Sequence, residues 1–150
     1  MKASSIRVEA KRPLLLLDTH VLVWSLEENR KLGTDTKEAI RLASREDRAL
    51  VSAITPWEIA LLVSKNRLTL NLDVMDWVRK ALALPGVRLT PLSAEIAVAS
   101  TRLPWEMHPD PADRILVATA RNLGATLVTA DGALLDYASS GHFAALDAKV

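Results

Sequence analysis

The sequence predicts an α/β fold, a three-layer sandwich around a central, mainly parallel sheet. Short apolar runs alternate along the 150-residue chain with segments whose apolar residues recur at the spacing of a helix. The runs are apolar throughout rather than at every second residue, which indicates strands buried on both faces and covered by helices. Neither a repeat nor a linker divides the chain. We therefore expect one domain over residues 13–150, preceded by a flexible leader over residues 1–12.

Five runs have the length and composition of strands, and the last of them is the weakest. They lie at 14–17 (LLLL), 49–54 (ALVSAI), 87–92 (VRLTPL), 125–129 (ATLVT) and 143–146 (FAAL). Each is separated from the next by at least one segment that can form a helix. This order favours parallel strands joined by helical crossovers.

Helices are expected between these strands, at 33–47, 55–68, 73–84, 93–103 and 111–124. Their ends carry residues that suit a helix boundary. The first helix starts at Thr34 or Thr36, the third starts on Asp73, and the fourth starts on Ser93. Thr55 itself is predicted to cap the second helix, with Pro56 in the first helical position. The last helix opens with Pro111 and closes just before Gly124.

Composition excludes several classes of function. Cysteine is absent, which removes disulfides, thiolate nucleophiles, zinc ribbons and iron–sulfur clusters. No apolar stretch approaches the ~20 residues that span a bilayer, so we expect no membrane association and a cytoplasmic protein. A net charge of +1 is small for a nucleic-acid-binding domain. A polyanionic substrate would therefore need a local patch of charge or a bound metal ion.

Four acidic residues follow predicted strands or begin predicted helices. They are Asp18, Glu58, Asp113 and Asp131. Because ligands of an open parallel sheet bind beyond the carboxyl ends of its strands, we expect these side chains on one edge of the sheet.

Each acid also has a purely structural interpretation. Thr55 and Glu58 have the spacing of a capping box, as do Asp110 and Asp113. Asp18 and Asp131 each stand where a helix N-cap is expected. For any one of them taken alone, the structural interpretation is favoured.

Taken together, the four acids favour a metal site. Carboxylates gathered on one edge repel one another unless a cation lies among them. Oxygen ligands without a histidine or cysteine beside them suit Mg²⁺, with Mn²⁺ as a substitute. Such an ion binds phosphate oxygens and assists the hydrolysis of phosphodiester bonds.

Three segments carry a resemblance to a known family: "LLLLDTHVLVW", "SAITPWEIA" and "HPDPADRILVATARNLGATLVTAD". In this order and spacing they resemble the acidic signature of PIN-domain ribonucleases, in particular the VapC-type toxins of toxin–antitoxin pairs. The resemblance runs from about residue 14 to about residue 146. It implies a PIN-like fold and metal-dependent cleavage of RNA.

The resemblance also implies roles for residues and partners. Asp18, Glu58, Asp113 and Asp131 would form the Mg²⁺ or Mn²⁺ cluster, and Thr129 would match the hydroxyl of the family's Thr/Ser-x-Asp element. Asp110 lies one turn before Asp113 and would replace it or add to it. The implied partners are an RNA substrate and a cognate antitoxin, and the chain would form a homodimer.

Two further residues near these acids have open roles. His20, two residues after Asp18, is expected to pack or to orient Asp18 rather than act as a base. Arg114 would contact phosphate or pair with a neighbouring acid. Among the tryptophans, Trp24 and Trp57 are expected in the core, whereas Trp77 is open between core and interface.

Other functions fit the sequence less well. A phosphoacceptor receiver domain would need paired acids after the first strand, and a haloacid-dehalogenase-type phosphatase would need an acid where His20 stands. The strongest alternative is a non-catalytic RNA-binding or scaffold module on the same fold. The presence of all four acids favours the enzyme over this module.

Overall fold

The computed structural model describes residues 12–104 and 110–150. These residues form a five-stranded sheet in which every pair of neighbouring strands is parallel. The strands are β1 (Leu15–Leu17), β2 (Ala49–Ser52), β3 (Val87–Thr90), β4 (Thr126–Thr129) and β5 (Ala144–Asp147). Their order across the sheet is β3-β2-β1-β4-β5. The predicted α/β fold is confirmed, and the predicted leader lies almost wholly outside the described residues.

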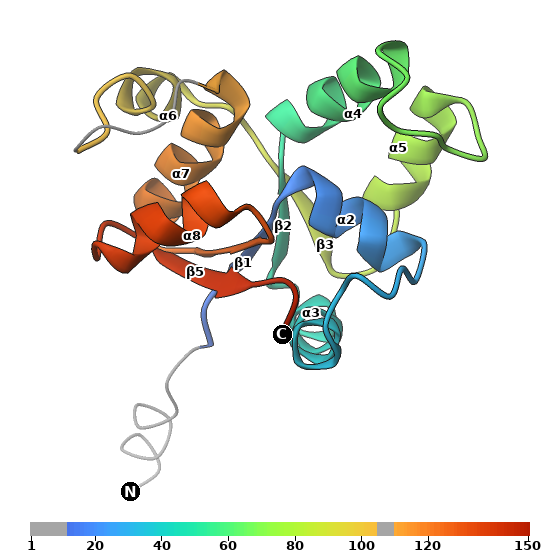
Figure 1. Ribbon diagram of the computed structural model, residues 1–150, viewed down its shortest axis with the longest axis horizontal. Helices are drawn as coiled ribbons and strands as arrows, with labels where there is room; N and C mark the ends of the chain where they lie inside the picture. The colour runs from blue at the N-terminus through green and yellow to red at the C-terminus, as the bar shows by residue number, and fades with distance from the viewer. Residues whose placement is uncertain (1–11, 105–109) are drawn as a thin grey trace, which may run out of the picture.

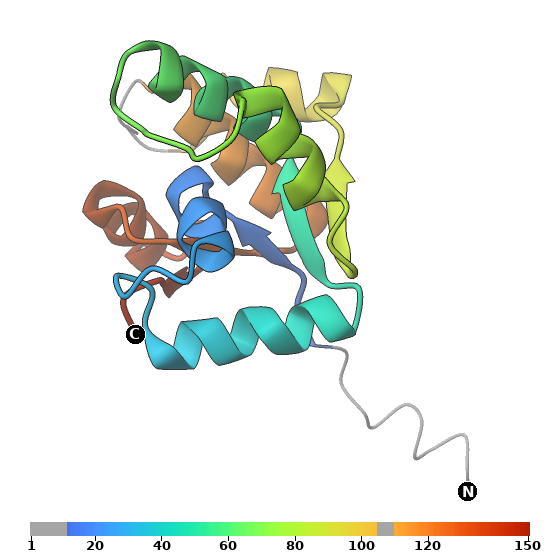
Figure 2. The same ribbon diagram turned by 90° about the vertical axis from the view of Figure 1, so that its right-hand side faces the viewer.

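Helices cover both faces of this sheet (Figures 1 and 2). They are α2 (Thr19–Leu26), α3 (Thr34–Arg45), α4 (Ile54–Ser64), α5 (Val74–Leu82), α6 (Ala94–Ala99), α7 (Pro111–Leu123) and α8 (Gly132–Ser139). In the described ranges, none of these helices has the length and apolar character needed to cross a membrane.

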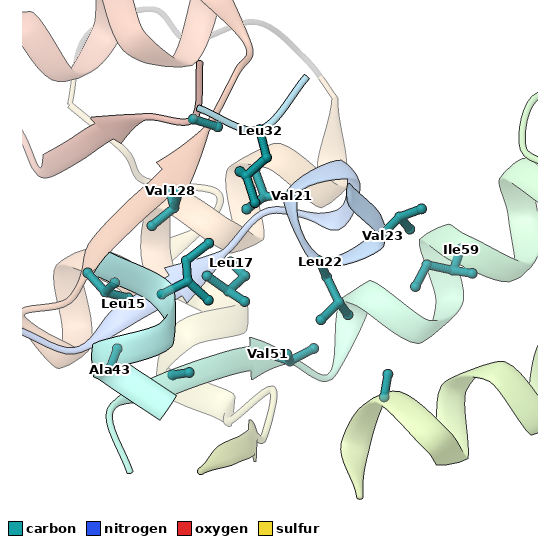
Figure 3. Packing of buried hydrophobic residues seen from close by; sticks show 14 of the residues in the cluster. Leu15, Leu17, Val21, Leu22, Val23, Leu32, Ala43, Val51, Ile59 and Val128 are labelled. Atoms are coloured by element: carbon teal, nitrogen blue, oxygen red, sulfur yellow. The ribbon is translucent and has the colours of Figure 1, made fainter. Parts of the chain in front are cut away.

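The first strand divides the core into two layers. Because side chains of a strand alternate between its faces, Leu15 and Leu17 enter one apolar cluster and Leu16 the other. The first cluster packs the sheet against α2, α3, α4 and α5, and Figure 3 shows its side chains from α2, α3 and α4. The second cluster packs it against α7 and α8. All three leucines are buried, as the uninterrupted apolar run predicted.

Several helix boundaries agree with the predictions. Asp73 and Ser93 cap α5 and α6, accepting hydrogen bonds from the backbone N–H groups of Met75 (3.1 Å) and Ile96 (3.2 Å). Gly124 ends α7 with a φ of 63°, a left-handed conformation that glycine adopts without strain. These caps are local features, and the sequence identifies them correctly.

The predicted start of α4 is wrong. The helix begins at Ile54, one residue before Thr55, and Ser52 Oγ at the end of β2 accepts the hydrogen bond of the Ile54 N–H (3.1 Å). Thr55 and Pro56 are thus the second and third helical residues rather than the cap and the first. The capping box between Thr55 and Glu58 does not form, which leaves the Glu58 carboxylate available for another contact.

The structure corrects the prediction for one tryptophan, Trp57, and decides the open one for Trp77. Trp57 is 52% exposed on α4, whereas Trp77 is 3% exposed within the first cluster. Since α4 is apolar on all sides, its sequence does not indicate which face turns inward; the structure buries Ile59 instead. Trp24 is partly buried against the first cluster, in line with its prediction.

Candidate metal centre

Asp18 lies directly after β1, at the middle of the carboxyl edge of the sheet. Its N–H donates to the carbonyl of Val128 on the neighbouring strand β4 (3.0 Å). One carboxylate oxygen, Oδ1, accepts from the N–H of Thr19 (2.7 Å) and caps α2. The other, Oδ2, accepts from the hydroxyl of Thr129 (2.6 Å). The side chain is 8% exposed, so Asp18 is both the predicted helix cap and a buried acid on the predicted edge.

Thr129 connects two of the acids. It is the last residue of β4 and is fully buried. Its Oγ1 donates to Asp18 and accepts from the N–H of Asp131 (3.0 Å). The hydroxyl therefore holds the start of the β4–α8 connection beside the end of β1.

Asp131 caps α8, as its structural interpretation predicted. Its Oδ1 accepts from the N–H groups of Ala133 (2.8 Å) and Leu134 (3.2 Å). The residue is exposed at the carboxyl edge. A carboxylate at a helix N-terminus is stabilised in its charged form by the helix dipole.

Glu58 reaches across to α2 instead of back to Thr55. Its Oε1 accepts a hydrogen bond of 2.5 Å from Thr19 Oγ1. Glu58 is half-buried on the second turn of α4. The contact joins the helices that follow β1 and β2, two neighbouring strands of the sheet.

Asp113 lies in the first turn of α7 and is 9% exposed. Asp110, the N-cap of this helix, is exposed and accepts the N–H of Asp113 on Oδ1 (3.1 Å). Of the two hydrogen bonds of the capping box predicted from the Asp110–Asp113 spacing, the one from the Asp113 N–H to the Asp110 side chain is thus present. Of the two acids, Asp113 is the one that the fold buries.

The electrostatics of the acids show that they lie near one another. Burial first, and then the negative charges of four neighbouring acids, raise the pKa of Asp113 to about 8. These neighbours are Asp18, Asp110, Asp131 and Glu58. A carboxyl group with such a pKa is destabilised as an anion and is stabilised by a nearby cation.

Two other acids are affected in the same direction. Burial raises the pKa of Asp18, although the hydrogen bonds from Thr129 and Thr19 oppose it. Burial likewise raises the pKa of Glu58, against the hydrogen bond from Thr19. The negative charge of Asp18 adds to the shift at Glu58. The edge therefore holds an excess of negative charge that its own hydrogen bonds do not balance.

These residues fit a divalent cation by chemistry. Carboxylate oxygens at a crowded, partly buried edge are the donors that Mg²⁺ and Mn²⁺ prefer. Within the described ranges, however, no group of three or more His, Cys, Asp or Glu side chains already converges as a metal cage. Repulsion between their negative charges is one physical reason why these acids do not converge. In addition, one oxygen of Asp131 and one oxygen of Glu58 accept hydrogen bonds from the protein.

The remaining predicted residues lie around this edge. His20 is exposed on α2, with its ring 6.3 Å from that of Trp24. Its effect on the pKa of Asp18 is smaller than those of burial and of the two hydrogen bonds. Arg114 Nη1 donates to the backbone carbonyl of Ser100 (3.5 Å), a contact that neither of its predicted roles included.

Sequence reasoning missed Thr19. This residue is 1% exposed and contacts both Asp18 and Glu58. The only signal in the sequence is a hydroxyl directly after the strand-end aspartate in "LLLLDTH". Its partner Glu58 is 39 positions away, so the contact depends on how α2 and α4 pack.

A parallel α/β sandwich with acidic residues beyond the carboxyl ends of its central strands is typical of the α/β domains that bind ligands at that edge. The chain belongs to the PIN-domain family, whose model matches residues 15–139. The resemblance predicted from the three acidic segments is confirmed. The match covers most of the described residues and includes all four acids.

Individual relatives agree with this assignment. The chain is 34% identical over 117 residues to "Ribonuclease VapC22" of Mycobacterium tuberculosis, covering 78% of this chain and 86% of the relative. Its fold is similar to that of VapBC2 from Rickettsia felis bound to a promoter DNA fragment, with a TM-score of 0.66 at 16% identity (89% and 98% coverage). It is also similar to FitAcB from Neisseria gonorrhoeae, with a TM-score of 0.59 at 25% identity (89% and 97% coverage).

Proposed function

We propose that this chain is a VapC-type ribonuclease, the toxin of a toxin–antitoxin pair, that hydrolyses RNA with the help of Mg²⁺. The observation that carries the proposal is the set of Asp18, Glu58, Asp113 and Asp131 on the carboxyl edge of the sheet, with an acid whose pKa is raised to about 8. The identity with a named ribonuclease over most of the chain supports the same activity.

The four acids have distinct parts in this proposal. Asp18, Asp113 and Asp131 hold the cation, and Glu58 completes its ligand set or orients the attacking water. When bound, Mg²⁺ supplies Lewis acidity toward a phosphate oxygen, and Mn²⁺ can replace it.

Thr129 serves these acids without binding the substrate. Its hydroxyl donates to Asp18 Oδ2 and so restricts the orientation of the Asp18 carboxylate. Asp110 is the exposed neighbour of Asp113, and it adds negative charge to the edge rather than replacing the buried acid. His20 adds positive charge beside Asp18 and Glu58 when it is protonated.

The net charge of the chain agrees with a role for a bound cation in attracting RNA phosphate. At +1, the chain has little overall attraction for a polyanion, and the acidic edge repels phosphate on its own. A divalent cation held by the four acids would offset that repulsion at this edge. The protein therefore needs no large basic face to bring RNA phosphate to the site.

The proposed partners are a cognate antitoxin and a second copy of the chain. The solved structure from Rickettsia felis is of VapBC2 bound to a promoter DNA fragment, which supports an antitoxin partner here. Large apolar side chains remain exposed, among them Trp57 at 52% and Leu89 at 50%. Light scattering of the purified chain, alone and with the product of its neighbouring gene, tests both partners. A strict monomer that ignores this product would contradict them.

Cleavage of a labelled RNA pool tests the activity. The purified chain, freed of any antitoxin, is incubated with Mg²⁺ or Mn²⁺, with a chelator control and Asp18→Asn alongside. We expect cleavage by the wild type alone, lost with the chelator. Asparagine keeps the cap and the volume of Asp18 but removes its charge, so the rate should fall by about 100-fold or more.

Two results would contradict the proposal. Cleavage by Asp18→Asn at the wild-type rate would show that the site lies elsewhere. Stoichiometric RNA binding by the folded wild type without cleavage, with Mn²⁺ bound, would favour the non-catalytic RNA-binding module.

A further inference from the structure

Thr19 is the one residue in the described ranges whose backbone and side chain each contact a different acid of the candidate centre. Its N–H donates to Asp18 Oδ1 (2.7 Å), and its Oγ1 donates to Glu58 Oε1 (2.5 Å). It stands at the first position of α2 and is 1% exposed. The residue therefore ties an acid that follows β1 to an acid on α4.

Glu58 needs such a contact more than the other acids do. Asp18 and Asp131 are fixed by the N–H groups that they cap. The predicted capping box would have fixed Glu58 in the same way, but α4 starts too early for it to form. Glutamate also has more rotatable bonds than aspartate, and the negative charge of Asp18 disfavours its approach.

Thr19 is suited to the task by its burial and its stiffness. A β-branched side chain has few χ1 rotamers, and the packing around a buried residue restricts them further. Its hydroxyl is thus held at a fixed place from which it donates to a carboxylate, a strong type of hydrogen bond. Thr129 gives Asp18 an equivalent hydroxyl partner on the other side.

We propose that Thr19 is a positioning residue that holds the Glu58 carboxylate beside Asp18, so that the two acids act on the same cation. The inference rests on the proposed function for its catalytic consequence. It concerns the geometry of the chain's own residues, so neither of its two tests requires RNA cleavage.

The first test measures the contact itself in metal-free protein. Melting temperatures of the wild type, Thr19→Val, Glu58→Met and the double variant form a double-mutant cycle, since methionine keeps the length of the side chain but has no carboxylate oxygen to accept the hydrogen bond. We expect the shift of the double variant to differ from the sum of the single shifts by about 2–4 °C. Additive shifts would overturn the inference, because they would show that the two side chains do not interact.

The second test measures Mn²⁺ affinity from the electron paramagnetic resonance signal of the free ion. Valine matches threonine in shape but lacks the hydroxyl, so Thr19→Val should bind Mn²⁺ about 10-fold more weakly, at the lower end of the loss seen when an outer partner of a metal ligand is removed. Thr19→Ser restores the donor and should return to within about twofold of the wild type.

A matched control separates positioning from general loss of a buried hydroxyl. Thr119 is also 1% exposed, and its hydroxyl donates to the carbonyl of Ile115 within α7 (2.7 Å). Thr119→Val should leave Mn²⁺ affinity unchanged. In the Glu58→Met background, Thr19→Val should cause little further loss, since the acceptor of its hydroxyl is already absent.

The outcomes distinguish this inference from the proposed function. Unchanged Mn²⁺ affinity in Thr19→Val, or an equal loss in the Glu58→Met background, overturns the positioning role. A wild type that binds no Mn²⁺ overturns the metal centre and this inference together. A wild type that binds Mn²⁺ with the expected effects at Thr19, yet cleaves no RNA, overturns the proposed function alone.

Discussion

Among the acids of the site, Asp113 is one whose charged form is strongly disfavoured by its surroundings. The residue is 9% exposed, and burial together with neighbouring negative charge raises its pKa to about 8 from 3.8. Between these two pH values the folded chain binds a proton that the unfolded chain has released. The free energy of unfolding should therefore fall as pH rises from about 4 to about 8 in metal-free protein.

Asp113→Asn removes this dependence because asparagine carries no charge at any pH. In the presence of a chelator, we expect the variant to exceed the wild type in stability at pH 8 by about 2 kcal/mol. Below pH 4 the two should be similar. Urea unfolding at several pH values measures the difference, and parallel curves for the two proteins would contradict the assigned pKa.

The side chain of Thr55 is a second place where burial opposes the chemistry of a residue. Its hydroxyl is buried and has no hydrogen-bond partner in the part of the chain that the structure describes. The side chain borders a small apolar space that Leu22, Val51 and Ile59 also line. A buried polar group without a partner lowers the free energy of unfolding by about 1–3 kcal/mol.

Thr55→Val should therefore raise the melting temperature, by about 2–4 °C for a gain of about 1 kcal/mol. The same substitution at Thr119, whose hydroxyl is hydrogen-bonded, should leave the melting temperature unchanged or lower it. Differential scanning calorimetry compares the two variants. Equal losses in both would mean that the Thr55 hydroxyl has a partner.

At the scale of elements, the start of α3 depends on the far end of the described chain. Its N-cap is Gly33, which supplies no side-chain cap. Instead, the carbonyl of Val150 accepts from the N–H of Asp35 (3.0 Å), and the carbonyl of Asp147 accepts from the Thr36 hydroxyl (3.0 Å). These contacts require close approach, since a Cβ on Gly33 would lie 2.1 Å from the carbonyl carbon of Val150.

Gly33→Ala should lower the free energy of unfolding by about 1–3 kcal/mol, because the added methyl forces the two segments apart. Gly132→Ala is the matched control: it is also at the start of a helix, and a Cβ there has no heavy atom within 4 Å. That variant should be neutral or slightly stabilising. Urea unfolding measures both, and a neutral Gly33→Ala would contradict the close contact.

The element scale also shows which features the sequence can predict. The caps at Asp73 and Ser93 and the glycine end of α7 depend on a few neighbouring residues, and these predictions are confirmed. The predicted start of α4 is wrong because threonine is a common N-cap residue, whereas Thr55 is buried in the core. Ser52, at the end of a strand, takes over the capping contact. Burial is decided by packing between elements, which local spacing does not determine.

At the scale of the whole molecule, the parallel sheet explains why acids distant in sequence lie at one edge. With β1 between β2 and β4, the segments that follow these strands all leave the sheet on the same side. The sequence predicted this arrangement from buried runs followed by acids. It did not predict the links between the acids, since the Thr19–Glu58 and Thr129–Asp18 contacts span 39 and 111 positions.

A cation bound to this edge should stabilise the entire fold, because it relieves the repulsion between segments that belong to separate elements. Saturating Mn²⁺ at about 100 times its dissociation constant adds roughly 2.7 kcal/mol, which corresponds to a rise in melting temperature of about 5–10 °C. At one fixed Mn²⁺ concentration, the rise should be larger at pH 8 than at pH 6, since protons compete with the ion for a carboxyl group such as Asp113. Asp18→Asn should lose most of the rise while its metal-free melting temperature stays near that of the wild type. If Mn²⁺ shifted both proteins equally, the ion would bind elsewhere, and the charge gathered at the edge of the sheet would need another explanation.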